Sequence, residues 1–255
     1  MTRARNRIRA LVLAGLLLLA GVAARSQQFN SDNYLSKPAG VATVILTYGQ
    51  RNSMVMTTFS LIPNWEFTAA AYIFNSDNNS LTSDGYSTSF YFKWMLHENA
   101  AKNGGIAVKG GTGLEPGYLV SGVGLEDAWK SYWVNVPITL GFRQNTLSWD
   151  IMPGASYTKN YGAGAQPAWA FTYSTRLAWY PKDPKWALVG EVFGAEGEGY
   201  VPAEYKTGVR WEPNQYVTFA FTYGQEFNGT NGAGFETGMM LFTPPFFCIT
   251  GCQPK

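Results

Sequence analysis

The sequence predicts an all-β protein: a transmembrane antiparallel up-and-down β-barrel of about twelve strands, with short periplasmic turns and longer extracellular loops. Three observations predict this fold. Only 14% of the 255 residues are charged and 16% are aromatic. Apolar and polar residues alternate with a period of two along most of the chain. Apolar runs of roughly 20 residues, which helical membrane proteins need, are approached only at the N-terminus.

Residues 1–24 are typical of a secretory signal peptide. Four arginines (Arg3, Arg5, Arg7 and Arg9) precede an apolar run over 10–20, and small residues favour cleavage after Ala24 or after Ser26. Removing this segment leaves 15 basic and 17 acidic residues, so the formal charge of +2 belongs to the signal. The mature chain is not basic, and no nucleic acid is expected as a partner. An uncleaved anchor is the alternative for this segment.

Strand-length runs with alternating character then follow one another along the chain. In the clearest run, 86–97, Phe92 and Trp94 face one way while Ser89 and Lys93 face the other. Runs of nine to twelve residues can cross a bilayer at a tilt. The runs cover 41–49, 53–61, 65–74, 86–97, 106–123, 132–142, 147–158, 169–179, 186–193, 205–211, 216–225 and 235–243.

The connections between these runs alternate between short and long. Short turns on one side and long polar loops on the other are the topology of outer-membrane barrels, and Trp or Tyr recurs at the strand ends, as in interfacial girdles. A soluble exported β-sandwich or a lipocalin-like barrel is the alternative. The predicted organisation is a signal peptide (1–24), a periplasmic lead-in (25–40), the transmembrane barrel (41–243) and a periplasmic C-terminal tail (244–255).

Two repeated units of the form turn, Pro-Asn, aromatic strand lie at 62–67 and 211–216. With the export signal and the final strand, they resemble bacterial outer-membrane β-barrels, and more loosely the transporter-like barrels of the phenol-degradation-pathway type. The resemblance implies a Gram-negative outer-membrane location, with lipid, lipopolysaccharide and the barrel insertion machinery as partners. Such barrels usually end on an aromatic residue. Here Phe242, Phe246 or Phe247 would take that part, because a short tail follows.

Seven charged residues are predicted to line the lumen. If the N-terminus is periplasmic, all seven fall in the periplasmic half, and five of them are basic, which favours anions. Glu204 and Glu236 are expected near the extracellular end. The alternative is that these groups form salt-bridge ladders that fill the interior. The candidate pore-lining residues are Glu66, Lys93, Arg143, Asp150, Arg176, Lys206 and Arg210.

No catalytic residue, cofactor or metal site is predicted. Outer-membrane phospholipases, lipid A deacylases and omptin-like proteases depend on a histidine paired with serine or acids. The single histidine, His97, ends a strand and is followed by Glu98. Cys248 and Cys252 are a candidate disulfide, since export permits one. Metal binding by this pair would need further ligands.

The sequence therefore predicts an outer-membrane pore for the passive passage of small solutes, with a preference for anions. The alternative is a non-conducting structural or adaptor barrel of an envelope complex, and an outer-membrane enzyme is a distant third. A pore is expected to isolate alone or as a homo-oligomer, and a structural barrel to isolate with an envelope partner.

Overall fold

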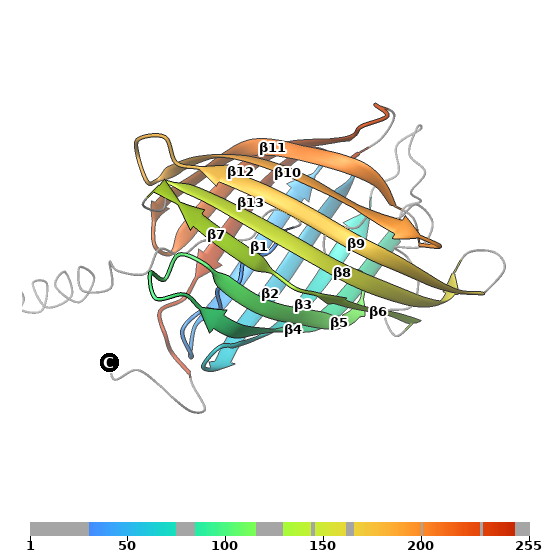
Figure 1. Cartoon of the computed structure of the whole chain (residues 1–255), viewed down its shortest axis with the longest axis horizontal. Helices are drawn as coiled ribbons and strands as arrows, with labels where there is room; N and C mark the ends of the chain where they lie inside the picture. Colours follow the sequence, from blue (N-terminus) through green and yellow to red (C-terminus); the bar gives the residue numbers. More distant parts are fainter. Residues whose placement is uncertain are drawn as a thin grey trace, which may run out of the picture.

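The computed structural model describes residues 31–74, 85–115, 130–143, 146–161, 166–199, 201–229 and 232–247. These residues confirm the predicted all-β fold, with strands that run obliquely across one barrel (Figure 1). Among them, no helix is long and apolar enough to cross a membrane. The candidate disulfide Cys248–Cys252 lies outside the described residues.

Thirteen strand segments are formed by the described residues. In chain order they are β1 (Ala42–Gly49), β2 (Asn52–Ile62), β3 (Trp65–Phe74), β4 (Gly85–Glu98), β5 (Gly105–Gly113), β6 (Ser131–Asn135), β7 (Ile138–Phe142), β8 (Leu147–Tyr161), β9 (Gln166–Trp179), β10 (Trp186–Gly197), β11 (Val201–Asn214), β12 (Val217–Glu226) and β13 (Gly234–Phe242).

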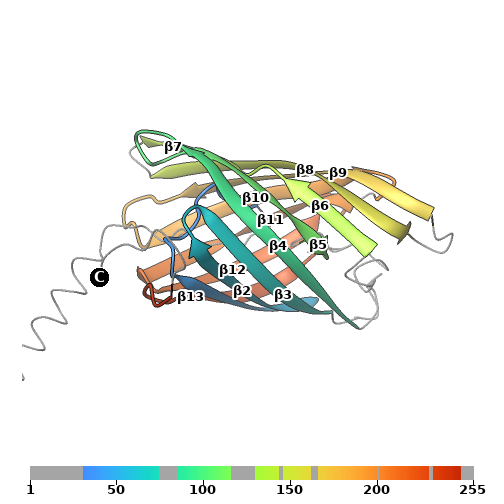
Figure 2. The ribbon, with the colours of Figure 1, turned by 90° about the horizontal axis from the view of Figure 1, so that it is seen from below.

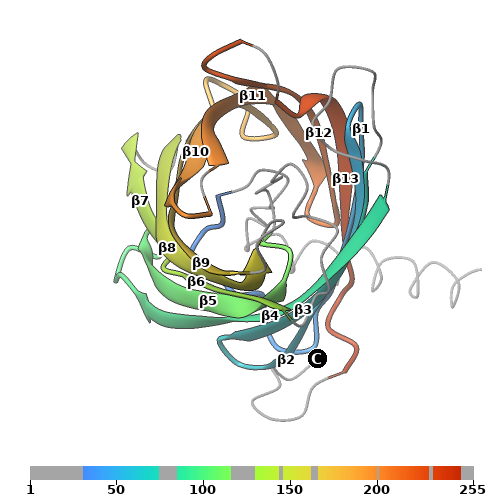
Figure 3. The same cartoon turned by 90° about the vertical axis from the view of Figure 1, so that its right-hand side faces the viewer.

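These segments make a closed barrel of twelve strands, the number that the sequence predicts. All neighbours are antiparallel, and β1 pairs with β13 to close the ring seen in Figure 3. β6 and β7 are two parts of one strand, because both pair with β5 on one side and β8 on the other. Val136 and Pro137 separate them, since proline has no N–H to donate to the ladder.

The predicted runs match the observed strands well, with two larger differences. The run at 65–74 coincides with β3, whereas the run at 106–123 ends at Gly113. Gly113 has a φ of +90°, a left-handed conformation that interrupts an extended strand. β11 extends beyond the predicted 205–211 on both sides.

The two faces of the barrel wall differ in polarity, as the alternation predicts. On β4, Phe90 and Trp94 are exposed on the outer face, while Ser89 and Lys93 are buried inside. An outward apolar face around a polar interior is the arrangement of a barrel in a lipid bilayer. The barrel is therefore an outer-membrane barrel, whose outward side chains contact lipid.

Aromatic side chains mark both ends of the outer wall. At the short-turn end, Trp65 stacks on Trp94 with ring centroids 5.1 Å apart. At the long-loop end, Tyr157 packs against Trp169 at 4.5 Å. Trp and Tyr prefer the two membrane–water interfaces, so these girdles hold the barrel at a fixed depth. Outer-membrane barrels keep their short turns on the periplasmic side.

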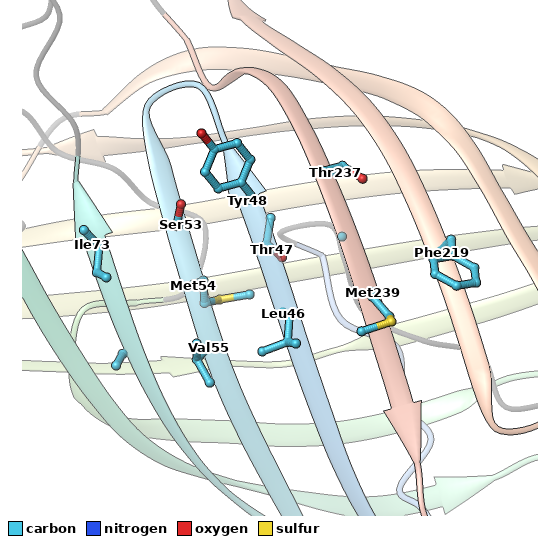
Figure 4. A pocket seen from close by; sticks show the side chains of 12 residues that line it. Leu46, Thr47, Tyr48, Ser53, Met54, Val55, Ile73, Phe219, Thr237 and Met239 are labelled. Carbon is cyan, nitrogen blue, oxygen red and sulfur yellow. The ribbon is translucent and has the colours of Figure 1, made fainter.

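An apolar groove of about 390 Å³ lies on the outer wall across β1, β2, β3, β12 and β13 (Figure 4). Exposed Leu46, Val55 and Phe219 line it. Because it faces outward, the groove belongs to the lipid-facing surface.

Candidate functional site: the charged lumen

Six of the seven predicted pore-lining residues lie where the sequence expects, on the inner face of the wall. All six are buried, with at most 7% of each residue exposed: Glu66, Lys93, Asp150, Arg176, Lys206 and Arg210. The prediction for Arg143 is wrong. Arg143 is exposed in the turn after β7, with a φ of +49°. The strand ends at Phe142, so the alternation no longer determines where the next side chain points.

A row of alternating charges lies on five of the six adjacent strands β8 to β13; β12 contributes none, because Gly224 is opposite Lys206. Arg176 is opposite Asp150 and Glu191 in the ladder, and Glu191 is opposite Lys206. The Arg176 guanidinium donates to Asp150 Oδ2 at 2.7 Å, and Lys206 Nζ lies 2.7 Å from Glu236 Oε2. Glu191 is not among the predicted pore-lining residues, although its alternation with exposed Leu188 and Gly190 indicates the inner face.

This row rises around the lumen because barrel strands are tilted, as Figures 1 and 2 show. A row of ladder partners runs perpendicular to the strands, so it climbs along the barrel axis. Lys206 consequently pairs with Glu236, which is opposite Gly49 at the loop end of β1. The expectation that Lys206 belongs to the periplasmic half is therefore not met, whereas Glu236 lies at the loop end as expected.

A second charged cluster lies on β3, β4 and β5. Glu66 and Lys93 are opposite each other and form an ion pair at 2.8 Å. Lys93 is in turn opposite Lys109, which is 1% exposed. Sequence reasoning missed Lys109 because glycines obscure the alternation of its run. Ile106 and Val108 take outward positions on β5, and this alternation indicates that Lys109 points inward.

The N-terminal segment (residues 31–37) also lies inside the barrel, where Figure 3 shows it in blue within the ring. Ser31 and Asp32 are 0% and 3% exposed, and Tyr34 is 1% exposed. The Ser31 backbone N–H donates to a Glu191 carboxylate oxygen. The Tyr34 hydroxyl donates to Glu98 at 3.0 Å. The segment therefore rises from the turn end to the middle of the lumen.

This placement differs from the expected periplasmic lead-in at 25–40. Nothing in the alternation pattern reveals it, because residues 31–37 form no strand and bind the wall through single polar contacts. The Tyr34 and Lys37 backbone N–H groups donate to Thr139 Oγ1 at 3.2 Å and to Glu66 Oε1 at 2.6 Å. Inside the barrel these backbone groups have acceptors, as buried N–H groups require.

Asp32 bridges the two lysines of the second cluster. Its carboxylate oxygens lie 3.4 Å from Lys93 Nζ and 3.6 Å from Lys109 Nζ. Burial raises the pKa of the Asp32 carboxyl, but the positive charges around it, led by Lys93 and Lys109, outweigh burial and lower the pKa below its ordinary value. Asp32 is therefore ionised at neutral pH.

Two other groups in the lumen have pKa values near neutrality. Burial lowers the pKa of the Lys37 ammonium to about 8, although Glu66 opposes the shift. Glu115, just beyond β5, reaches into the lumen, where Asn135 Nδ2 donates to it at 2.9 Å. Burial raises the pKa of the Glu115 carboxyl to about 7. Both groups change charge within the range in which a channel can be measured.

At the turn end, Arg210 pairs with Glu212, with Nε 2.9 Å from Oε1. Arg210 is 2% exposed, and its Nη2 makes no hydrogen bond within the described structure. His97 is exposed at the end of β4, at the rim expected for it. Within the described ranges, no three His, Cys, Asp or Glu side chains are grouped to hold a metal ion.

The lumen also contains an apolar cluster. Inward side chains of β1 to β4, β6 and β13 pack into a cluster that includes Ile45, Met56, Tyr72, Tyr91 and Trp133. The Tyr91 and Trp133 rings lie 5.1 Å apart. The apolar cluster therefore lies on some of the same strands as the second charged cluster, with Tyr91 of β4 close to Lys109.

No protein-family model and no curated protein matches the sequence. Among solved structures, the KdgM porin in complex with disordered oligogalacturonate superimposes with a TM-score of 0.54 at 9% identity, over 79% of this chain and 98% of that one. The NanC porin gives 0.52 at 6% identity, over 79% and 97%. An outer membrane channel from Pseudomonas putida F1 gives 0.49 at 11% identity, over 82% and 97%. At such identities, the two porins establish the fold alone, which is that of an outer-membrane β-barrel.

Proposed function

We propose that the protein is a passive channel for small solutes across the outer membrane. The observation that carries the proposal is the row of charged side chains from Asp150 to Glu236, which rises along the inner wall. Charged groups at membrane depth are costly, and they mark ion or solute pathways when they face a polar interior. The two porins with the same fold support this reading, one of them by its complex with an anionic oligosaccharide.

The net charge of the lumen does not by itself favour anions. Among the described residues, five basic and seven acidic side chains are buried. The sequence-based expectation of a positive lumen counted Arg143 and did not include Asp32, Glu115 or Glu191. We propose that the native channel discriminates only weakly between K⁺ and Cl⁻, and that any anion preference is local to Lys93 and Lys109.

Planar-bilayer recording of the purified protein tests the proposal. We expect stepwise conductance, and a reversal potential in a KCl gradient that depends on lumenal charge. Replacing the lumenal carboxylate in Glu191→Gln should shift the reversal potential towards Cl⁻. The matched control is Glu196→Gln on the same strand, since Glu196 is exposed outside the charged row. His97→Ala should conduct as the native protein does.

A non-conducting structural barrel is the second candidate, favoured by the N-terminal segment inside the lumen and by the ion pairs of the lumenal lysines and arginines. Absence of conductance in correctly folded protein, together with a partner that co-purifies from native membranes, would establish this candidate. A channel should instead purify alone or as a homo-oligomer.

A further inference from the structure

We propose that Lys93 and Lys109 form a binding site for the carboxylate group of a permeating solute, and that Asp32 occupies this site as an internal substitute. The inference rests on the proposed channel function and deepens it by naming a solute class. The class is a small carboxylate attached to an apolar body.

The two lysines are placed by the wall of the barrel. They are opposite each other on β4 and β5, and their side chains are 7% and 1% exposed. Like charges directly opposite in a ladder repel each other. Glu66 pairs with Lys93 on the neighbouring strand at 2.8 Å. A carboxylate that bridges both ammonium groups relieves the repulsion, and Asp32 does so from inside the lumen.

Asp32 is not part of the wall. It belongs to the N-terminal segment, which precedes β1 and has further contacts with the wall besides those of the Asp32 side chain. These contacts come from the backbone N–H of Ser31, from Tyr34 and from the backbone N–H of Lys37. The Asp32 carboxylate therefore reaches the lysines from the space through which a solute would pass, so a solute carboxylate can take the same position.

The surroundings of the site indicate the rest of the ligand. Lys109 Nζ lies 5.0 Å from the centroid of the Tyr91 ring and 5.6 Å from that of Trp133. The Tyr91 hydroxyl donates to Met56 Sδ at 3.1 Å, at the edge of the apolar cluster. Ring faces and a thioether suit an apolar or flat body.

Calorimetric titration with benzoate tests the site on the full-length protein in detergent. Benzamide, which has the same ring and no charge, is the control ligand. We expect benzoate to bind Asp32→Asn at least about tenfold more tightly than the native protein, a difference of about 1.4 kcal/mol. Asp32→Glu should bind as weakly as the native protein, because it keeps the internal carboxylate. The double variant Lys93→Gln/Lys109→Gln should lose the binding.

Exposed residues of the β9–β10 turn supply matched controls. Asp183→Asn and Lys185→Gln remove the same charges outside the barrel and should leave benzoate affinity unchanged. Equal affinity in the native protein and Asp32→Asn, or binding that survives in the double lysine variant, would overturn the proposal. Equal binding of benzamide would also overturn it.

Recording the same proteins in bilayers separates this inference from the channel itself. Benzoate should reduce the chloride current of Asp32→Asn at lower concentrations than in the native protein. Binding without conductance in any variant would refute the channel and leave the site in place. Conductance without benzoate binding would refute the site and leave the channel in place.

Discussion

Three ionisable residues outside the strands contribute charge to the lumen. Asp32, Lys37 and Glu115 lie outside the strands, yet each lies inside the barrel against groups of the wall. Burial moves the pKa values of Lys37 and Glu115 towards neutrality, to about 8 and about 7. Their charge states therefore change in a pH range where the wall remains folded.

We expect the cation preference of the channel to rise in two steps as pH increases. Glu115 gains its negative charge as pH rises through about 7, and Lys37 loses its positive charge as pH rises through about 8. Each change makes the lumen more negative by one charge. Reversal potentials between pH 6 and pH 9 measure the steps. Glu115→Gln should remove the lower step and Lys37→Met the upper one, and a step that persists in its own variant would contradict the assignment.

Among the elements, the strands follow from the sequence and the N-terminal segment does not. β3 has the predicted bounds, and its burial alternates without a break from Trp65 to Phe74. Alternation cannot place residues 31–37, since the Ser31 contact joins residues 160 positions apart and involves one backbone N–H. The same limit explains Arg143 and Lys109. Arg143 lies just beyond the end of β7. Lys109 lies in β5, where a glycine, Gly111, takes the next inward position and hides the alternation.

The N-terminal segment reduces the open area of the lumen, so its removal should enlarge the channel. We expect a variant that lacks residues 31–36 but keeps the signal region to have a single-channel conductance at least about twofold higher than the native protein, since the segment crosses the polar part of the lumen. Single-channel recording of both proteins in 1 M KCl measures the two conductances. Unchanged conductance would mean that ions bypass the segment.

In the whole molecule, the barrel wall separates the lipid outside from the polar lumen inside, and successive residues of each strand face one or the other. The low charge content of the sequence follows from this arrangement, since the outward positions of each strand contact lipid and most of the charged strand residues in the described structure point inward. Pairing of β1 with β13 closes the ring of described strands, as a membrane-spanning sheet requires. The two aromatic girdles then set the depth, and the long loops define one end.

This orientation makes a prediction for intact cells. In a background with Cys248→Ser and Cys252→Ser, Asn228→Cys in the β12–β13 loop should react with a membrane-impermeant maleimide at the cell surface. Asp183→Cys in the β9–β10 turn should react only after the outer membrane is permeabilised. Both positions are exposed, so accessibility within the protein is matched. The reverse labelling pattern would show that the short turns, and not the long loops, face the cell surface.

The covalent link between Asp32 and the wall has a quantitative consequence. Because residues 31–37 are held against the wall, the chain presents Asp32 to its site at an effective concentration at least in the millimolar range, which short flexible linkers give. A free carboxylate must therefore approach that concentration before it displaces Asp32 from Lys93 and Lys109. Below this concentration the Asp32 carboxylate stays bound to the two lysines. Above it the solute carboxylate binds them instead. The length of the segment before β1 thereby sets the solute level to which the channel responds.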